Sequence, residues 1–147
     1  MRLWVDDLAS FARICPRLDP AQDGQWVEGI YIQHWHETLP SDIAPAKVVI
    51  EAFACELPAP FIELMASQPS PPCWINLEYL SAESWVEDCH GLASPQRVGN
   101  QSLNKYFFFP GFTAKTGGLL CEHDLLSLIH ISEPTRRYHT SRMPSSA

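Results

Sequence analysis

The residues most suited to chemistry lie within Pro71–Pro95, where an apolar run is followed at once by polar and aromatic side chains. The run Trp74–Leu77 has the composition of a short buried strand, and carboxylate, phenol and hydroxyl groups come directly after it. In open α/β sheets, ligands bind just outside the carboxyl ends of the strands. We therefore predict substrate contacts for the side chains of Glu78, Tyr79, Ser81 and Glu83.

Glu51 and Glu56 form a second pair of carboxylates and bracket the segment EAFACE at the end of the apolar run Val48–Ile50. If this run and Trp74–Leu77 are neighbouring strands, the carboxylates behind them converge and can hold a guanidinium group through bidentate hydrogen bonds. Helix capping and solvation account for the same carboxylates equally well. We keep both interpretations and add Glu51 to the predicted substrate contacts.

His34 and His36 are two residues apart, so on a strand both imidazoles lie on one face, as a metal site requires. No third or fourth ligand follows at a familiar spacing. Two partly exposed histidines at the end of a strand explain the pattern better. We therefore predict no metal site and no cofactor in this chain.

Three other groups have ordinary structural explanations. Asp6 and Asp7 follow an apolar run, where an acidic residue can hold a ribose hydroxyl, but helix capping is the better explanation. The adjacent Cys89 and His90 do not indicate catalysis, because a fold normally joins a nucleophile and its base from distant positions. The segment Thr116–Gly118 lacks the lysine and the spacing of a phosphate-binding loop, and we predict a turn there.

The composition indicates an acidic globular protein. Its 147 residues are 46% hydrophobic and carry a net charge of −7 without a basic cluster, which argues against nucleic acid as a partner. No apolar run approaches the roughly 20 residues that span a bilayer. Acidic residues interrupt the N-terminus too early for a signal peptide, and the five widely spaced cysteines without a CxxC are typical of reduced thiols. We therefore expect a cytoplasmic location and no membrane partner.

The elements that must position these residues alternate between strands and short helices. Apolar runs predict strands at Leu3–Val5, Val27–Trp35, Val48–Ile50, Trp74–Leu77 and Tyr106–Phe109. A first helix is expected from a cap at Asp6 or Asp7 to about Ile14, and a second from Pro60 to about Ser67. Leu92–Asn104 is expected to be a loop. This order predicts an α/β fold with a mostly parallel sheet.

Both ends of the chain have unusual sequences. The first predicted strand begins right after Arg2, like the second strand of a βαβ unit that has lost its first strand and helix. Ser127–Arg136 and Ser141–Ala147 resemble translated sequencing-adaptor DNA, so we expect residues 127–147 to be a non-native, disordered tail. Residues 1–126 would then form one partial domain with seven basic and sixteen acidic residues, a net charge of −9.

Four strings of unusual composition, in register from Arg2 to about Leu126, resemble a single enzyme family. They are RLWVDDL near the start, VVIEAFACELP (Val48–Pro58), WINLEYLSAESWVEDCHGL (Trp74–Leu92) and KYFFFPGFTAKTGGLL (Lys105–Leu120). Together they resemble the bacterial protein-arginine rhamnosyltransferases that modify elongation factor P. Such long strings are far more specific than a short glycine motif.

The resemblance implies a GT-B glycosyltransferase, in which two Rossmann-like domains face each other across a cleft. It implies transfer of rhamnose from dTDP-β-L-rhamnose to one arginine of elongation factor P, with inversion and without a metal. An arginine side chain is always protonated and therefore a poor nucleophile. A carboxylate would activate or orient its guanidinium nitrogen, and an acidic protein suits such a basic acceptor.

The resemblance also implies that essential parts lie outside this sequence. The family's catalytic aspartates follow a first strand upstream of Met1, and its nucleotide-sugar pocket lies mainly in a C-terminal domain. We therefore expect residues 1–126 to be an incomplete Rossmann-like, acceptor-side N-terminal domain with no catalytic residue, inactive by itself. Two alternatives stay open: a non-catalytic fragment that at most binds elongation factor P, and a partial reading frame with no function of its own.

Overall fold

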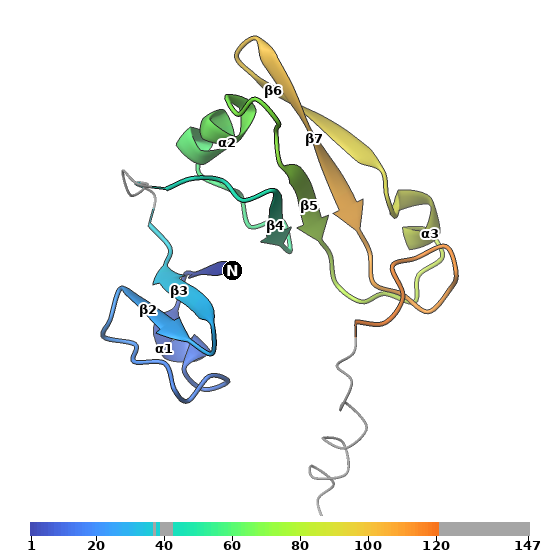
Figure 1. Ribbon diagram of the computed structural model, residues 1–147. Coiled ribbons are helices and arrows are strands. Elements are labelled where there is room, and N and C mark those ends of the chain that lie inside the picture. Colours follow the sequence, from blue (N-terminus) through green and yellow to red (C-terminus); the bar gives the residue numbers. More distant parts are fainter. Residues whose placement is uncertain (37, 39–42, 121–147) are drawn as a thin grey trace, which may run out of the picture.

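The computed structural model describes residues 1–36, 38 and 43–120, in which the chain forms two β-sheets with short helices (Figure 1). The first sheet has the strand order β1-β3-β2, and the second has the order β4-β5-β7-β6. We call them the small sheet and the large sheet. The predicted tail, residues 127–147, lies outside the described residues.

The small sheet is a hairpin with a third strand added in parallel. β2 (Gly24–Val27) and β3 (Ile30–His34) pair antiparallel across the turn Glu28-Gly29, whose φ angles are 50° and 82°. Two successive positive φ angles define a type I′ turn, which matches the twist of the strands on either side. β1 (Arg2–Val5) pairs in parallel with the other edge of β3.

Helix α1 (Leu8–Phe11) follows β1 and confirms the predicted cap. The Asp7 carboxylate accepts the Ser10 N–H at 2.9 Å, and hydrogen bonds from the Ser10 hydroxyl and amide hold the pKa of Asp7 below its ordinary value. The α-helix is shorter than predicted. Beyond it the Ile14 N–H bonds to the Phe11 carbonyl at 3.0 Å, which is the tighter three-residue spacing of a 3₁₀ turn.

The large sheet has three neighbouring parallel strands and one antiparallel edge strand. The parallel strands are β4 (Val48–Ala52), β5 (Cys73–Leu77) and β7 (Gln101–Phe108). β6 (Ala93–Val98) pairs antiparallel with β7 across the turn Gly99-Asn100. Helix α2 (Ala59–Ala66) connects β4 to β5, and helix α3 (Val86–Cys89) lies between β5 and β6.

Each sheet has its own hydrophobic core. In the large sheet, helix α2 places Phe61 and Met65 against Trp74 of β5 and Leu103 of β7. The core of the small sheet is formed by residues of α1, the following loop and the hairpin: Leu8, Leu18, Val27 and Ile32.

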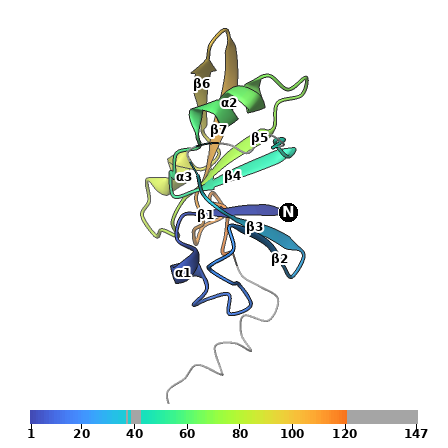
Figure 2. The same ribbon diagram turned by 90° about the vertical axis from the view of Figure 1, so that its left-hand side faces the viewer.

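Two tryptophans, one in β1 and one just after β3, contact the core of the large sheet. Trp4 and Trp35 pack against that core, and the Trp4 ring meets the Phe61 ring edge-on at 4.9 Å between centroids. Beside this contact a groove of about 680 Å³ runs between β1 and β4 and is lined by residues of both strands. Figure 2 shows the two strands next to each other. Among the described strands, β1 and β4 each have one edge without a partner.

The predicted α/β class is confirmed, but the sheets are mixed rather than mostly parallel, because two hairpins went unrecognised. The predicted single strand Val27–Trp35 contains the last residue of β2, the turn Glu28-Gly29 and all of β3. The predicted loop Leu92–Asn104 contains β6 and the start of β7, with Gly99 (φ 57°) at the first turn position. Glycine at that position is typical of a type II′ hairpin turn.

The prediction that Val48–Ile50 is buried on both faces is wrong. Val48 is 52% exposed and Ile50 is 59% exposed. Both lie on the face of β4 opposite to Val49 and Glu51, which face the core, and this opposite face lines the groove. No helix in the described part of the chain is long and apolar enough to span a bilayer.

Candidate functional site

The carboxyl ends of three parallel strands lie side by side at one edge of the large sheet. The register pairs Ala52 of β4 with Leu77 of β5, and Leu77 with Phe108 of β7. The Phe53 N–H bonds to the Leu77 carbonyl at 2.7 Å, and the Glu78 N–H bonds to the Phe108 carbonyl at 2.9 Å. The last residues of the three strands are therefore aligned side by side across the sheet. We call the residues that follow these strands, 53–54, 78–83 and 109–118, the strand-end edge.

A buried amide organises this edge. Asn76 is 0% exposed; its side-chain oxygen accepts the Ala54 N–H at 3.0 Å and its NH₂ group donates to the Glu78 carboxylate at 2.5 Å. Phe53 and Ala54 have φ angles of 58° and 54°, which are unfavourable for residues with a Cβ. Asn76 thus holds a strained turn and a carboxylate in place together. Sequence reasoning passed over it, because a single buried asparagine within a strand has no periodic signature.

Tyr79 presents an aromatic surface to solvent. Its ring stacks on Phe53 with 4.0 Å between centroids and 16° between planes, and Tyr79 is 67% exposed. A stacked, exposed aromatic pair suits a planar cationic group such as a guanidinium. The structure therefore adds to the predicted Tyr79 the ring of Phe53, which sequence reasoning did not select, whereas the neighbouring Glu78 is bonded to Asn76.

Ser81 and Glu83 lie on the next part of the edge. Ser81 forms a parallel bridge with Gly111, and its hydroxyl accepts the Glu83 N–H at 3.1 Å. The Glu83 side chain is exposed. Ser81 thus shapes the loop, whereas Glu83 presents a free-standing carboxylate to solvent.

Glu51 does not lie with these four residues. It is 2% exposed, and its carboxylate accepts hydrogen bonds from the Lys105 ammonium at 2.8 Å and the Trp74 indole N–H at 3.1 Å. The Lys105 ammonium also lies 5.0 Å from the centroid of the Trp74 ring. Both oxygens of Glu51 are therefore engaged inside the protein, where they join β4 to β5 and β7. Glu56, its predicted companion, is exposed ahead of α2.

An ion pair supports the outer loop of the edge. The Lys115 ammonium lies 3.1 Å from the Glu87 carboxylate. Hydrogen bonds from Lys115 and Thr113 hold the pKa of Glu87 below its ordinary value. This pair ties α3 to the loop that follows β7, so it positions the loop against which Ser81 is bridged.

The remaining sequence candidates have structural partners. His90 accepts the Phe109 N–H through Nδ1 at 3.1 Å, next to Cys89 in the chain. The turn expected at Thr116–Gly118 lies just before it, at Ala114–Lys115, where the Thr116 N–H bonds to the Thr113 carbonyl at 3.2 Å; the Gly117 N–H bonds to the Phe109 carbonyl at 2.8 Å. These groups stabilise the loops of the strand-end edge.

A separate cluster on the small sheet joins His34 and His36 to Asp23, which sequence reasoning missed. The side-chain ligand atoms of the three residues all lie within 4.8 Å of one another. The hairpin explains this, because pairing Gly24 with Gln33 places Asp23 opposite His34. The Glu28-Gly29 turn was the signal that could have found Asp23, since counting outward from it pairs residues 23 and 34.

Comparison with known proteins gives one consistent family. A sequence model described as Elongation-Factor P (EF-P) rhamnosyltransferase EarP matches residues 1–144. The chain is similar to the protein-arginine rhamnosyltransferase of Pseudomonas putida, with 58% identity over 128 residues. These cover 86% of this chain and 33% of the relative.

Two further relatives carry the same name. The protein-arginine rhamnosyltransferase of Shewanella oneidensis is 52% identical over 130 residues, which are 85% of this chain and 32% of the relative. That of Pseudomonas aeruginosa is 48% identical over 141 residues, which are 96% of this chain and 35% of the relative. The chain thus spans about a third of the length of these relatives.

The family match includes part of the segment 127–147, and the boundary at residue 126 stays a prediction. The predicted relationship itself is confirmed by the match over residues 1–144 and by three relatives of 48% to 58% identity. The chain belongs to the EarP family of elongation factor P rhamnosyltransferases, which are protein-arginine glycosyltransferases.

Proposed function

We propose that this chain is the acceptor-side part of an inverting glycosyltransferase that transfers rhamnose from dTDP-β-L-rhamnose to an arginine of elongation factor P. The observation that carries the proposal is family membership over residues 1–144, with relatives named as protein-arginine rhamnosyltransferases. The proposal includes a GT-B enzyme with this chain in its Rossmann-like N-terminal domain. It includes a cytoplasmic location, where translation factors are found, and no cofactor besides the sugar donor.

The chemistry of the strand-end edge supports this role. Glu78 and Glu83 supply carboxylates, and the stack of Phe53 and Tyr79 supplies an aromatic face. Together these are the groups that bind a guanidinium by charge, hydrogen bonding and stacking. An acidic protein with net charge −7 also attracts a basic acceptor at long range. We propose Glu78, Tyr79, Ser81 and Glu83 as the acceptor-contact region.

The proposed residues bind and orient rather than catalyse. Glu78 is held by Asn76, so its carboxylate has a fixed direction and can align a guanidinium nitrogen without rearrangement. We assign no catalytic residue to this chain. Glu51 contributes indirectly, by joining β4 to β5 and β7 beneath the edge.

A chimera tests the proposal. Residues 1–120 replace the corresponding part of the Pseudomonas putida relative, and the product is incubated with dTDP-β-L-rhamnose and elongation factor P. We expect mass spectrometry to find one added deoxyhexose on an arginine. A chimera that folds but transfers no sugar, while the parent enzyme does, would refute the proposal. In the active chimera, Tyr79→Ala should raise the KM for elongation factor P, whereas Trp26→Ala, which removes an exposed aromatic of the small sheet, should not.

A second candidate is binding of elongation factor P without catalysis. It is favoured by the fact that the chain spans only a third of its relatives. Calorimetric titration of this chain with elongation factor P measures it directly. Heat that saturates at one acceptor per chain supports this role, and no heat at high micromolar concentration excludes it.

A further inference from the structure

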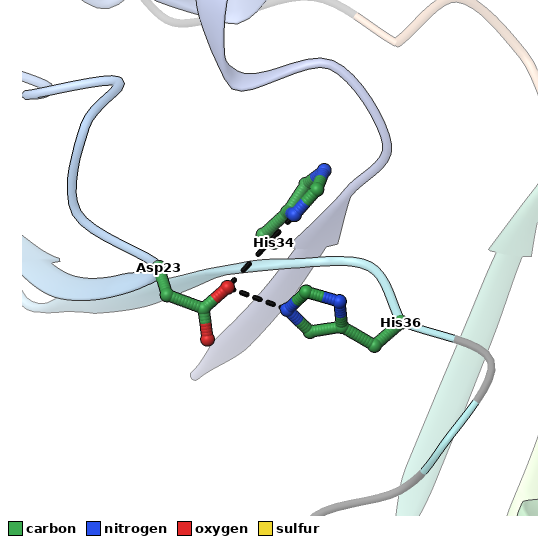
Figure 3. A group of neighbouring side chains, drawn as sticks. All are labelled: Asp23, His34 and His36. Atoms are coloured by element: carbon green, nitrogen blue, oxygen red, sulfur yellow. Dashed lines mark hydrogen bonds and ion pairs between the residues drawn. The ribbon is translucent and has the colours of Figure 1, made fainter.

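We propose that Asp23, His34 and His36 bind one divalent transition-metal ion of the Zn²⁺ type at the end of the small sheet (Figure 3). The inference departs from the expectation drawn from sequence, which found no third ligand. It concerns a structural site, on a different sheet from the proposed acceptor-contact residues.

The hairpin brings the three ligands together. Asp23 precedes β2 and lies opposite His34, whose N–H bonds to the Asp23 carbonyl at 2.7 Å. His36 is two residues beyond His34 and returns to the same side, as alternation along an extended chain requires. In Figure 3 dashed lines connect both imidazole rings to the same oxygen of the Asp23 carboxylate.

The distances suit an ion after small side-chain rotations. The Asp23 Oδ1 atom lies 2.5 Å from His36 Nε2 and 3.8 Å from His34 Nδ1, and all ligand atoms lie within 4.8 Å. A tetrahedral ion with bonds of about 2.1 Å places its ligand atoms about 3.4 Å apart. The exposed fractions of the side chains are 61% for Asp23, 39% for His34 and 44% for His36. They therefore have room to rotate, and an ion has a path of entry.

The tautomer of His34 is the strongest argument. Its Nε2 atom lies 3.0 Å from the Asp6 carbonyl oxygen, which can only accept a hydrogen bond, so Nε2 carries the proton. Nδ1 then has no proton to donate to Asp23 Oδ1, which lies 3.8 Å away and beyond hydrogen-bond distance, so its lone pair is available to an ion. A ligating histidine whose other nitrogen donates to a backbone carbonyl is also the usual arrangement at protein metal sites.

The chemical types of the three ligands indicate which metal ion the site prefers. Two imidazoles and one carboxylate suit Zn²⁺ and similar transition metals, whereas Mg²⁺ and Ca²⁺ prefer oxygen ligands alone. Three protein ligands leave a fourth position for water. The bound ion would connect the start of β2 to the end of β3 and thereby close the open end of the hairpin. Binding to the folded state alone raises stability.

The alternative explanation is a hydrogen bond alone, because a His36 Nε2–H group can donate to Asp23 Oδ1 at the observed 2.5 Å without any ion. Only a metal site binds an ion with defined stoichiometry. Titration with metal therefore separates them.

The test is calorimetric titration of the full chain with ZnCl₂, with MgCl₂ as the comparison ion. To leave only His34, His36 and His90, the chain carries His123→Gln, His130→Gln and His139→Gln. We expect one Zn²⁺ per chain, no heat with Mg²⁺, and a rise in Tm with Zn²⁺. Co²⁺ should give the visible absorption bands of nitrogen and oxygen ligands without a thiolate charge-transfer band.

A matched pair of carboxylate variants identifies the site. Asp23→Asn should weaken Zn²⁺ binding by at least about tenfold. Glu28→Gln, an exposed carboxylate in the turn of the same hairpin, should leave the affinity unchanged. His36→Gln should abolish the Co²⁺ bands. Absence of Zn²⁺ heat, a thiolate spectrum, or equal affinity of the two carboxylate variants would each overturn the proposal.

Discussion

The two sheets use their polar side chains in opposite ways. In the large sheet the buried polar residues, Glu51 and Asn76, have their partners inside the protein and shape the strand ends from within. In the small sheet the polar cluster of Asp23, His34 and His36 lies at the surface, within reach of a solute. The buried polar groups of the large sheet therefore position the strand-end edge, whereas the exposed groups of the small sheet are themselves the proposed metal ligands.

The sheets also differ in how they are stabilised. The large sheet has helix α2 packed over a core that includes Trp74 and Met65, which is 0% exposed. The small sheet has four buried core residues and gains contacts by placing Trp4 and Trp35 on the core of the large sheet. We infer that the small sheet depends on the large one more than the reverse.

The largest expected effect concerns the buried ion pair of the large sheet. Lys105→Met leaves the Glu51 carboxylate buried without its charged partner, which costs about 4 kcal/mol of unfolding free energy. Chemical denaturation measures the loss. Adding Glu51→Gln to this variant should restore most of it, because no buried charge then remains. The control Lys115→Met affects an exposed pair and should change stability little.

A second substitution tests the dependence of the small sheet. Ile32→Ala removes a residue that is 3% exposed and should cost about 3 kcal/mol. Native-state hydrogen exchange should show faster exchange at β2 and β3, with β5 and β7 still protected. Equal loss of protection in both sheets would show a single cooperative unit instead. Ile14→Ala, at an exposed position of the same unit, serves as the control.

A smaller effect is expected where a buried amide positions the strand-end edge. Asn76→Ala removes the bonds to Ala54 and Glu78 and should lower the unfolding free energy by about 2 kcal/mol. Exchange of the Ala54 amide should accelerate and the Tyr79–Phe53 stack should loosen. Asn104→Ala, at an exposed position of β7, should do neither.

The smallest effect is the response to acid. The folded-state pKa values of Asp7 and Glu87 lie below their ordinary values of 3.8 and 4.5. A lowered carboxyl pKa adds stability above the ordinary value, and this stability is lost as pH falls through the folded-state pKa. Thermal unfolding should therefore show a stability that declines below about pH 4.5. Glu87→Gln should flatten this decline, and an unchanged pH profile would contradict the assignment.

Several elements could be predicted from local sequence alone. Asp7 caps α1 and Pro60 lies in the first turn of α2, because both effects depend on residues close together in the chain. The run Trp74–Leu77 is within β5. The predicted carboxyl-end position of Glu78 and Tyr79 follows from that strand. Their acceptor contacts stay a prediction.

The features that the sequence did not predict depend on pairing between strands. The turns Glu28-Gly29 and Gly99-Asn100 interrupt patterns that by themselves predict one strand and one loop, so local sequence does not reveal the two hairpins. Without the first turn, the sequence also gives no sign that Asp23 lies opposite His34. The exposure of Ile50 follows from which face of β4 packs on the core, and no local pattern in an apolar run determines this.

The open edges of β1 and β4 have a consequence for handling the protein. Within residues 1–36, 38 and 43–120 neither edge has a strand partner, and both lie beside one groove, so they offer backbone groups with which an extended segment of another copy can pair. The net charge of −7 opposes such encounters through repulsion. Salt screens this repulsion over about 10 Å at 0.1 M ionic strength and leaves backbone pairing intact. Solutions of this chain should therefore aggregate more slowly at low ionic strength than at high ionic strength.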